Sequence, residues 1–157
     1  MRHLSWVRNR QSRPAPRLAR YRPRAEVLEG RCLPSTVTNL NDAGPGSLRD
    51  AIASTPSGGT VDFQTGLTGT IVLTTGELAI TKDLTTAGPG AGVITVSGNH
   101  ASRVFYIPAA VTVDISGLSI ADGQADVFGG GGIRNDGTLA VTNCTIGNNY
   151  AEFRARP

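Results

Sequence analysis

The stretch that decides the fold is TLAVTNCTIGNN, residues 138–149. Its apolar residues stand at alternating positions on both sides of a two-residue polar corner, at Leu139, Val141, Cys144 and Ile146. The same arrangement occurs 26 residues earlier in TVDISGLSIADG, residues 112–123. Alternation with period two is typical of strands that bury one face, and a pattern that returns at an interval indicates stacked structural repeats.

A third copy is assigned to ELAITKDLTTAG, residues 77–88, with its apolar positions at Leu78, Ile80 and Leu84. The step from Ile80 to Ile115 is 35 residues, so an inserted loop is expected around residues 98–102. The three copies predict an all-β chain folded as a right-handed parallel β-helix, a β-solenoid of about three rungs whose equivalent strands stack at roughly 4.8 Å.

A β-sandwich is the alternative fold for short strands separated by turns. A sandwich should show hairpins with two-residue turns, and only Asn135-Asp136-Gly137 has that character. A solenoid corner explains these three residues equally well. The 20 glycines and the low share of charged residues, 17%, favour strands and tight turns over helices in either fold.

The chain is expected to have four parts. Residues 1–34 hold nine arginines and two glutamates, a charge of +7, and are predicted to be a disordered basic tail. The remaining parts are a cap (35–59), the rungs (60–151) and a non-repeat tail (152–157). Because residues 35–157 carry a charge of −4, the basic pI describes the tail and does not predict specific nucleic-acid binding.

The cap is expected to contain one short amphipathic helix, SLRDAIAS, residues 47–54. Ser47 can cap it, with Asp50 three residues later in the capping-box position. Leu48, Ala51 and Ile52 then share one face. The helix should end before Pro56.

No residue pattern predicts catalysis, a metal or a cofactor. The glycines at 129–132 lack the lysine of a phosphate-binding loop, and four aspartates lack calcium-loop spacing, at Asp114, Asp122, Asp126 and Asp136. Arg134 with Asp136 is the one opposite-charge pair within a recognisable rung. His100 is expected to be a solvated loop residue. Neither Cys32 nor Cys144 has metal-ligand spacing, and Cys144 is expected to be a small buried hydrophobe.

Three asparagines are expected at solenoid corners, at Asn143, Asn148 and Asn149. Asparagine hydrogen-bonds its own backbone readily, and like residues can stack on each other in successive rungs. Their predicted role is structural.

Two segments resemble parts of known β-helix families. VTNLNDAGPGSLRDAI, residues 37–52, resembles the N-terminal capping module of bacterial β-helix surface proteins, in which a SLREAI-type helix precedes the rungs; the matching residues are Ser47, Leu48, Arg49, Asp50 and Ile52. VFGGGGIRNDGTLAVTNCTIGNNYA, residues 127–151, is similar to the repeats of chlamydial polymorphic outer membrane proteins. Gly131, Gly132 and Ile133 supply its GGAI-like element, and CTIGNN replaces the FxxN element.

A third segment, RAEVLEGRCL at 24–33, resembles the LEPR-XLL motif near the start of large planctomycete exported proteins. The matching residues are Glu26, Leu28, Glu29, Arg31 and Leu33, and the segment departs from the motif at Gly30 and Pro34. The chain has no apolar core of a conventional signal sequence and no apolar run long enough for a transmembrane helix. The resemblance implies export to the cell surface, the outer membrane or the extracellular space.

The resemblances imply a non-enzymatic surface or secreted β-helix protein with a structural or adhesin-like role. Surface polysaccharide or other envelope proteins are the expected partners. The alternative is the remnant of a β-helix polysaccharide lyase or glycoside hydrolase. Because members of these families are much longer, we expect a fragment of a longer protein. An open final rung would expose strand edges, so self-association and poor solubility are also expected.

Overall fold

A computed structural model describes residues 35–126 and 129–152; the segment at 24–33 that resembles the LEPR-XLL motif, the rest of the predicted basic tail and residues 153–157 lie outside this part. Five strands form one sheet in the order β1 (Ser35–Val37), β2 (Gly59–Phe63), β5 (Leu84–Ala87), β8 (Thr112–Ser116) and β12 (Thr138–Thr142). Four form a second sheet, in the order β3 (Gly69–Val72), β6 (Ile94–Ser97), β9 (Ser119–Ala121) and β13 (Thr145–Gly147). Three form a third, in the order β4 (Leu78–Ala79), β7 (Phe105–Ile107) and β11 (Ile133–Asn135), and β10 (Gln124–Ala125) pairs with β14 (Tyr150–Ala151).

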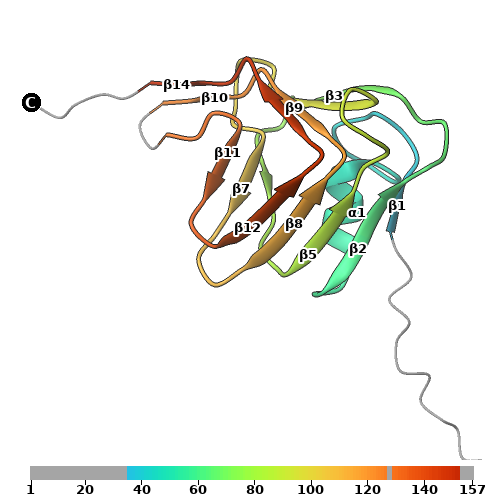
Figure 1. Cartoon of the computed structure of the whole chain (residues 1–157). Helices are drawn as coiled ribbons and strands as arrows, with labels where there is room; N and C mark the ends of the chain where they lie inside the picture. Colours follow the sequence, from blue (N-terminus) through green and yellow to red (C-terminus); the bar gives the residue numbers. More distant parts are fainter. Residues whose placement is uncertain (1–34, 127–128, 153–157) are drawn as a thin grey trace, which may run out of the picture. The chain divides into compact units, whose positions relative to one another are not determined.

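Every described strand pair is parallel, and from β2 onward strands that follow each other in sequence lie in different sheets (Figure 1). The chain therefore winds from sheet to sheet and returns one layer further along, which is a β-solenoid. The predicted all-β parallel β-helix is confirmed. It has about four turns rather than three, because β2 and β3, which precede the copy at residues 77–88, form one turn together with β4 at the start of that copy.

The predicted register is right in one place and wrong in another. Leu139 pairs with Val113 and Ile146 with Ile120, as the step of 26 residues requires. The third copy is misplaced: Leu84, not Leu78, pairs with Val113. Thr86 is the reason. It occupies the inward position beside Ile115 although it is polar, so the alternation that identifies β5 as an equivalent strand is hidden in the sequence.

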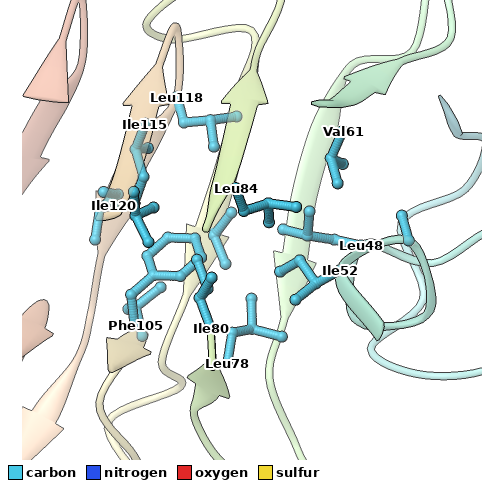
Figure 2. Close-up of a cluster of buried hydrophobic side chains, with 14 of the residues drawn as sticks. Leu48, Ile52, Val61, Leu78, Ile80, Leu84, Phe105, Ile115, Leu118 and Ile120 are labelled. Carbon is cyan, nitrogen blue, oxygen red and sulfur yellow. The ribbon is translucent and has the colours of Figure 1, made fainter. Parts of the chain in front are cut away.

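The core consists of inward-facing side chains that stack along the solenoid axis. Each stack, or column, contains one residue from every turn. Figure 2 shows part of it, with Leu78, Ile80 and Phe105 gathered between the sheets. The column of the four-stranded sheet is Ile71, Val96, Ile120 and Ile146. The first three are fully buried, whereas Ile146 in the last described turn is 53% exposed. Cys144 also lies in the last described turn, where no further turn covers it, and it is only half-buried. This corrects the expectation of a buried thiol.

The predicted helix is present as α1, Leu48–Ser54, and lies beside β1 and β2 (Figure 1). Ser47 is its N-cap and accepts a hydrogen bond from the Asp50 N–H. The Asp50 carboxylate accepts one from Gly46 N–H rather than from the backbone of the cap residue. Leu48 and Ile52 are buried and point toward Leu84 and Leu78 (Figure 2). Thus α1 covers the N-terminal end of the core.

The region predicted to be the cap, residues 35–59, contains a strand as well as α1. β1 pairs in register with β2, Val37 lying beside Phe63, so the cap region itself contributes a strand to the five-stranded sheet. In the part of the chain that the structure describes, no helix has the length and apolar character to cross a membrane.

Candidate functional site: the charged face of the third sheet

The outer face of β4, β7 and β11 gathers charged and aromatic side chains. Parallel pairing places Ala79, Tyr106 and Arg134 in one outward column. Two further charged residues flank it: Glu77 immediately precedes β4, and Arg103 lies two residues before β7. We refer to Glu77, Arg103, Tyr106, Arg134 and Asp136 as the charged face.

Arg134 is held from two sides. Its Nη2 lies 2.9 Å from Asp136 Oδ2, and its guanidinium carbon lies 5.3 Å from the centroid of the Tyr106 ring, within the range of a cation–π contact. The hydrogen bond to Asp136 raises the pKa of Arg134 above its ordinary value. The guanidinium therefore stays protonated, and it can bind an anion or stack against a planar group.

Arg103 connects three successive turns. Its Nη1 lies 2.6 Å from Glu77 Oε2, and its Nε donates to the Gly130 carbonyl at 2.9 Å. Glu77 belongs to the first turn, Arg103 to the second and Gly130 to the third. The side chain of Arg103 is only 13% exposed, so this ion pair is largely withdrawn from water and fixes the turns along the solenoid axis.

The same line of contacts continues into the cap through Arg49. Its Nη2 lies 2.7 Å from Asp42 Oδ1, and its Nη1 donates to the Glu77 carbonyl at 2.9 Å. Asp42 Oδ2 also accepts from the backbone N–H and hydroxyl groups of Thr74 and Thr75. We call Asp42, Arg49, Thr74 and Thr75 the cap clamp, because it joins the loop before α1 to the turn before β4.

The cap clamp changes the acidity of Asp42. Burial alone would raise the pKa of this carboxyl, since its side chain is only 8% exposed. The hydrogen bonds from Arg49, Thr75 and Thr74 outweigh burial and hold the pKa of Asp42 well below its usual range. The carboxylate is thus charged and fully engaged at neutral pH.

A shallow pocket of about 340 Å³ lies between α1 and β4. Its lining comprises Arg49, Ile52, Ala53, Leu78, Ala79, Thr81 and Lys82. The Lys82 ammonium donates to the Ala53 carbonyl at 2.8 Å, near the C-terminal end of α1, where helix carbonyls lack intrahelical partners. Both cations of the pocket are therefore used to hold the helix against the first turn.

The ion pairs of the charged face limit the reactions that its carboxylates could catalyse. Glycoside hydrolysis needs two carboxyl groups, one of which is protonated and acts as an acid. Glu77 and Asp136 are each bound to an arginine instead. Across residues 35–126 and 129–152, no three His, Cys, Asp or Glu side chains are grouped so that they could hold a metal ion.

The outer face of the four-stranded sheet is different in character. One hydroxyl-bearing residue per turn occupies the same outward position: Thr70, Thr95, Ser119 and Thr145. We call this set the hydroxyl column. It contains no acid or base, and Ser119 Oγ accepts a hydrogen bond from Gly92 N–H.

The residues predicted from the glycine-rich repeat lie where the third and fourth turns meet. The Gly132 carbonyl accepts hydrogen bonds from the Val104 and Phe105 N–H groups. A Cβ at Gly131 would collide with the Tyr150 carbonyl oxygen, and one at Gly132 with the Asn149 side chain. These two glycines are needed for close backbone approach. Gly129 and Gly130 of the same run adopt a positive φ, of 62° and 68°, which glycine reaches without steric cost.

The asparagines occupy corners, but they do not stack on each other. Asn143 and Asn148 adopt φ of 51° and 54°, a left-handed conformation that asparagine tolerates. Asn149 donates to the Ile120 carbonyl and accepts from Gly123 N–H, so it joins its turn to the backbone of the previous one. The expected ladder of like residues is wrong, because Gly117, Asp122 and Gly123 occupy the equivalent corners one turn earlier.

The charged face also contains an opposite-charge pair that joins two turns, Glu77 with Arg103. The structure brings Glu77 and Arg103 onto the same side as Arg134, whereas the sequence pattern singled out only Arg134 with Asp136. A usable signal existed: Glu77 and Arg103 are opposite charges 26 residues apart, which is the length of one turn. His100 lies in the expected loop with its side chain 72% exposed.

Comparisons of the chain with protein-family models, with curated proteins and with solved structures found no match.

Proposed function

We propose that this protein is a non-enzymatic β-solenoid of the cell surface or the extracellular space, with a structural or adhesin-like role. The observation that carries the proposal is the pairing on the charged face. Arg103 is bound to Glu77 of the preceding turn and so ties two turns together, and Arg134 is bound to Asp136 of its own turn. A stalk needs such axial ties because each turn contacts only its neighbours.

The hydroxyl column supports the same proposal. A surface that presents hydroxyl groups at the strand spacing of a sheet offers hydrogen bonds to a sugar polymer without offering an acid or a base. The Arg134 guanidinium, which lies over the Tyr106 ring, adds a planar cationic group against which a sugar can pack. Surface polysaccharide is therefore the expected partner, bound weakly and without turnover.

The test has two arms that use the full chain. In the first, the protein is mixed with insoluble neutral and uronic-acid polysaccharides, and the bound fraction is measured by sedimentation. Binding that falls severalfold in Tyr106→Ala, with no change in polymer viscosity, is the expected result. Loss of viscosity over time would contradict the proposal.

The second arm addresses location. Intact cells that produce the protein are treated with protease, and loss of the protein is compared with loss of a cytoplasmic marker. Selective loss of the solenoid is expected. Complete protection in intact cells, followed by digestion after lysis, would contradict a surface location.

A remnant polysaccharide lyase is the second candidate, and the cluster of Arg134, Tyr106 and Glu77 is the observation that favours it. Lyases of this architecture need a base that abstracts a proton from the sugar ring. Asp136 raises the pKa of Arg134, which is the opposite of what a base requires. Cleavage of a uronic-acid polymer that is abolished by Arg134→Ala and retained in His100→Ala would establish this candidate in place of the first.

A further inference from the structure

The pocket between α1 and β4 combines an apolar floor with a cationic rim. Ile52 and Leu78 are buried and form its floor, and Ala53 and Ala79 add exposed methyl groups to its walls. None of the described residues that line it is an Asp or a Glu. Its volume of about 340 Å³ lies near the lower limit for small-molecule sites, which suits one sugar ring or a group of similar size.

Lys82 brings to this rim a charge that no carboxylate offsets. Within the described part of the chain, Arg49, Arg103 and Arg134 are each paired with a carboxylate. The Lys82 ammonium forms no ion pair there, and its one hydrogen-bond acceptor is the Ala53 carbonyl. A lysine ammonium has three N–H donors, so two of them remain for a ligand in the pocket.

The two acidic side chains that border this region are engaged elsewhere. Asp83 follows Lys82 directly, but its carboxylate accepts a hydrogen bond at 2.8 Å from the Thr112 N–H, at the start of β8 in the five-stranded sheet. Glu77, which precedes β4, pairs with Arg103 at 2.6 Å. The rim therefore presents a cation, whereas the charged face presents ion pairs.

The pocket continues along the solenoid axis onto the charged face. Ala79, which lines the pocket, pairs with Tyr106, and Tyr106 pairs with Arg134. Because neighbouring strands lie about 4.8 Å apart, the backbone at Arg134 lies roughly 10 Å from that at Ala79. The Arg134 guanidinium, over the Tyr106 ring, is a second cationic group on this line. A chain of linked sugars that starts in the pocket can thus extend across two further turns.

We propose that the pocket binds the carboxylate-bearing sugar of an acidic polysaccharide, whose next sugars lie along β4, β7 and β11. The carboxylate accepts hydrogen bonds from the Lys82 ammonium, a charge-assisted contact, and from the Thr81 hydroxyl. The apolar face of the sugar ring packs against the methyl groups of Ala53 and Ala79. This inference rests on the proposed function and adds to it the class of polysaccharide and the place where its charge is recognised.

The test is calorimetric titration of the full chain with a trimer of galacturonic acid. The fully methyl-esterified trimer is the matched ligand, because it keeps the rings and linkages and removes the charges. The free trimer should bind severalfold more tightly than the ester. Lys82→Met removes the charge and keeps most of the aliphatic chain, so it should abolish this preference, whereas Lys82→Arg should retain it.

A double variant separates a site from general electrostatic attraction. Lys82→Met combined with Thr138→Lys restores the net charge on the exposed outer face of β12. Because the new cation is far from the pocket along the solenoid, the preference for the free trimer should stay absent.

A second measurement needs no variant and is independent of how well the variants fold. Lys82 is the single lysine of the chain, so peptide mapping after amine-directed labelling reports on this side chain alone. Saturating free trimer should slow the labelling of Lys82 severalfold, and the ester at the same concentration should not.

Three results would overturn the proposal. The first is equal binding of the free and esterified trimers that Tyr106→Ala still weakens, which would leave the polysaccharide role standing without the pocket. The second is a preference restored by the double variant, and the third is unchanged labelling of Lys82 at saturating trimer. Absence of binding to both trimers and to every polysaccharide in the sedimentation assay would remove the proposed function as well.

Discussion

The core of the solenoid is covered at its N-terminal end and partly uncovered in the last described turn. At the N-terminal end the core is closed by α1, and its first layers are buried as completely as the middle ones: Val37 and Val61 have no exposed surface. In the last described turn the same columns continue, but Val141 and Ile146 are partly exposed. The comparison teaches that a buried position in a solenoid is defined by the layer above it as much as by the residue itself.

The largest expected effect comes from comparing two residues of the same inward column, Ile120 in a covered turn and Ile146 in the last described turn. Ile120→Ala should lower the free energy of unfolding by about 3–4 kcal/mol, because it leaves a cavity in a covered layer. Ile146→Ala should lower it by only about 1 kcal/mol, since half of that side chain is already in water. Urea denaturation of both variants checks the difference.

Equal losses of stability in Ile120→Ala and Ile146→Ala would contradict the comparison between the two layers.

The cap clamp should give the next largest effect. Asp42→Asn removes the charge that Arg49, Thr74 and Thr75 bind, and we expect a loss of about 2 kcal/mol at pH 7. The folded-state pKa of Asp42 lies below its unfolded value, so the contribution is present in full above the unfolded pKa of about 3.9. It is lost progressively as the pH falls from there toward the folded pKa.

Denaturation at several pH values checks this prediction. The stability difference between wild type and Asp42→Asn should be constant between neutral pH and about pH 5 and should shrink below about pH 4. Asp114→Asn is the control, because that carboxylate is exposed on the outer face of β8. A difference that persists unchanged in acid would contradict the assigned role.

The next prediction concerns the close approach of the backbone at Gly131, in the third turn, to the backbone at Tyr150, in the fourth. Gly131→Ala should lower stability by about 2 kcal/mol, because the added methyl group meets the Tyr150 carbonyl. Gly147→Ala, in β13, meets nothing and has no positive φ, so it should change stability by less than about 0.5 kcal/mol. Thermal melting of both variants followed by circular dichroism separates the two expectations.

The smallest expected effect is a gain. Thr86 is fully buried in an inward column between Val61 and Ile115, and in the described part of the chain its hydroxyl has no hydrogen-bond partner. Thr86→Val keeps the shape and removes the unsatisfied group, so stability should rise by about 1 kcal/mol. Thr85→Val, on the outward side of the same strand, should have little effect. A loss of stability in Thr86→Val would show that the hydroxyl is satisfied in solution.

Local features of the fold were predictable because each depends on residues near one another in sequence. The helix, its Ser47 cap and its buried face follow from capping chemistry and a period of 3.6 residues. The strands β8 and β12 follow from alternation, and their register follows from the repeated step of 26 residues. The register of β5 was predicted wrongly because Thr86 breaks the alternation that marks the other strands.

The candidate site was less predictable because its contacts join different turns. Arg134 with Asp136 was visible, being two residues apart. Arg103 with Glu77 and Arg49 with Asp42 require knowledge of the register, and the register was wrong in the first half of the chain. The asparagine corners were found, but their partners depend on which residue occupies the corner one turn earlier.

The sequence by itself determined that this chain is a parallel β-solenoid with a capping helix, because period-two alternation and a repeated step leave few other ways to bury the apolar residues. Only the tertiary structure decided how many layers there are, which charges pair between them and which inward residues remain uncovered. The physical reason is that burial and ion pairing in a solenoid arise between turns. The pattern along one turn defines which way a side chain points, but the neighbouring turn decides what it touches.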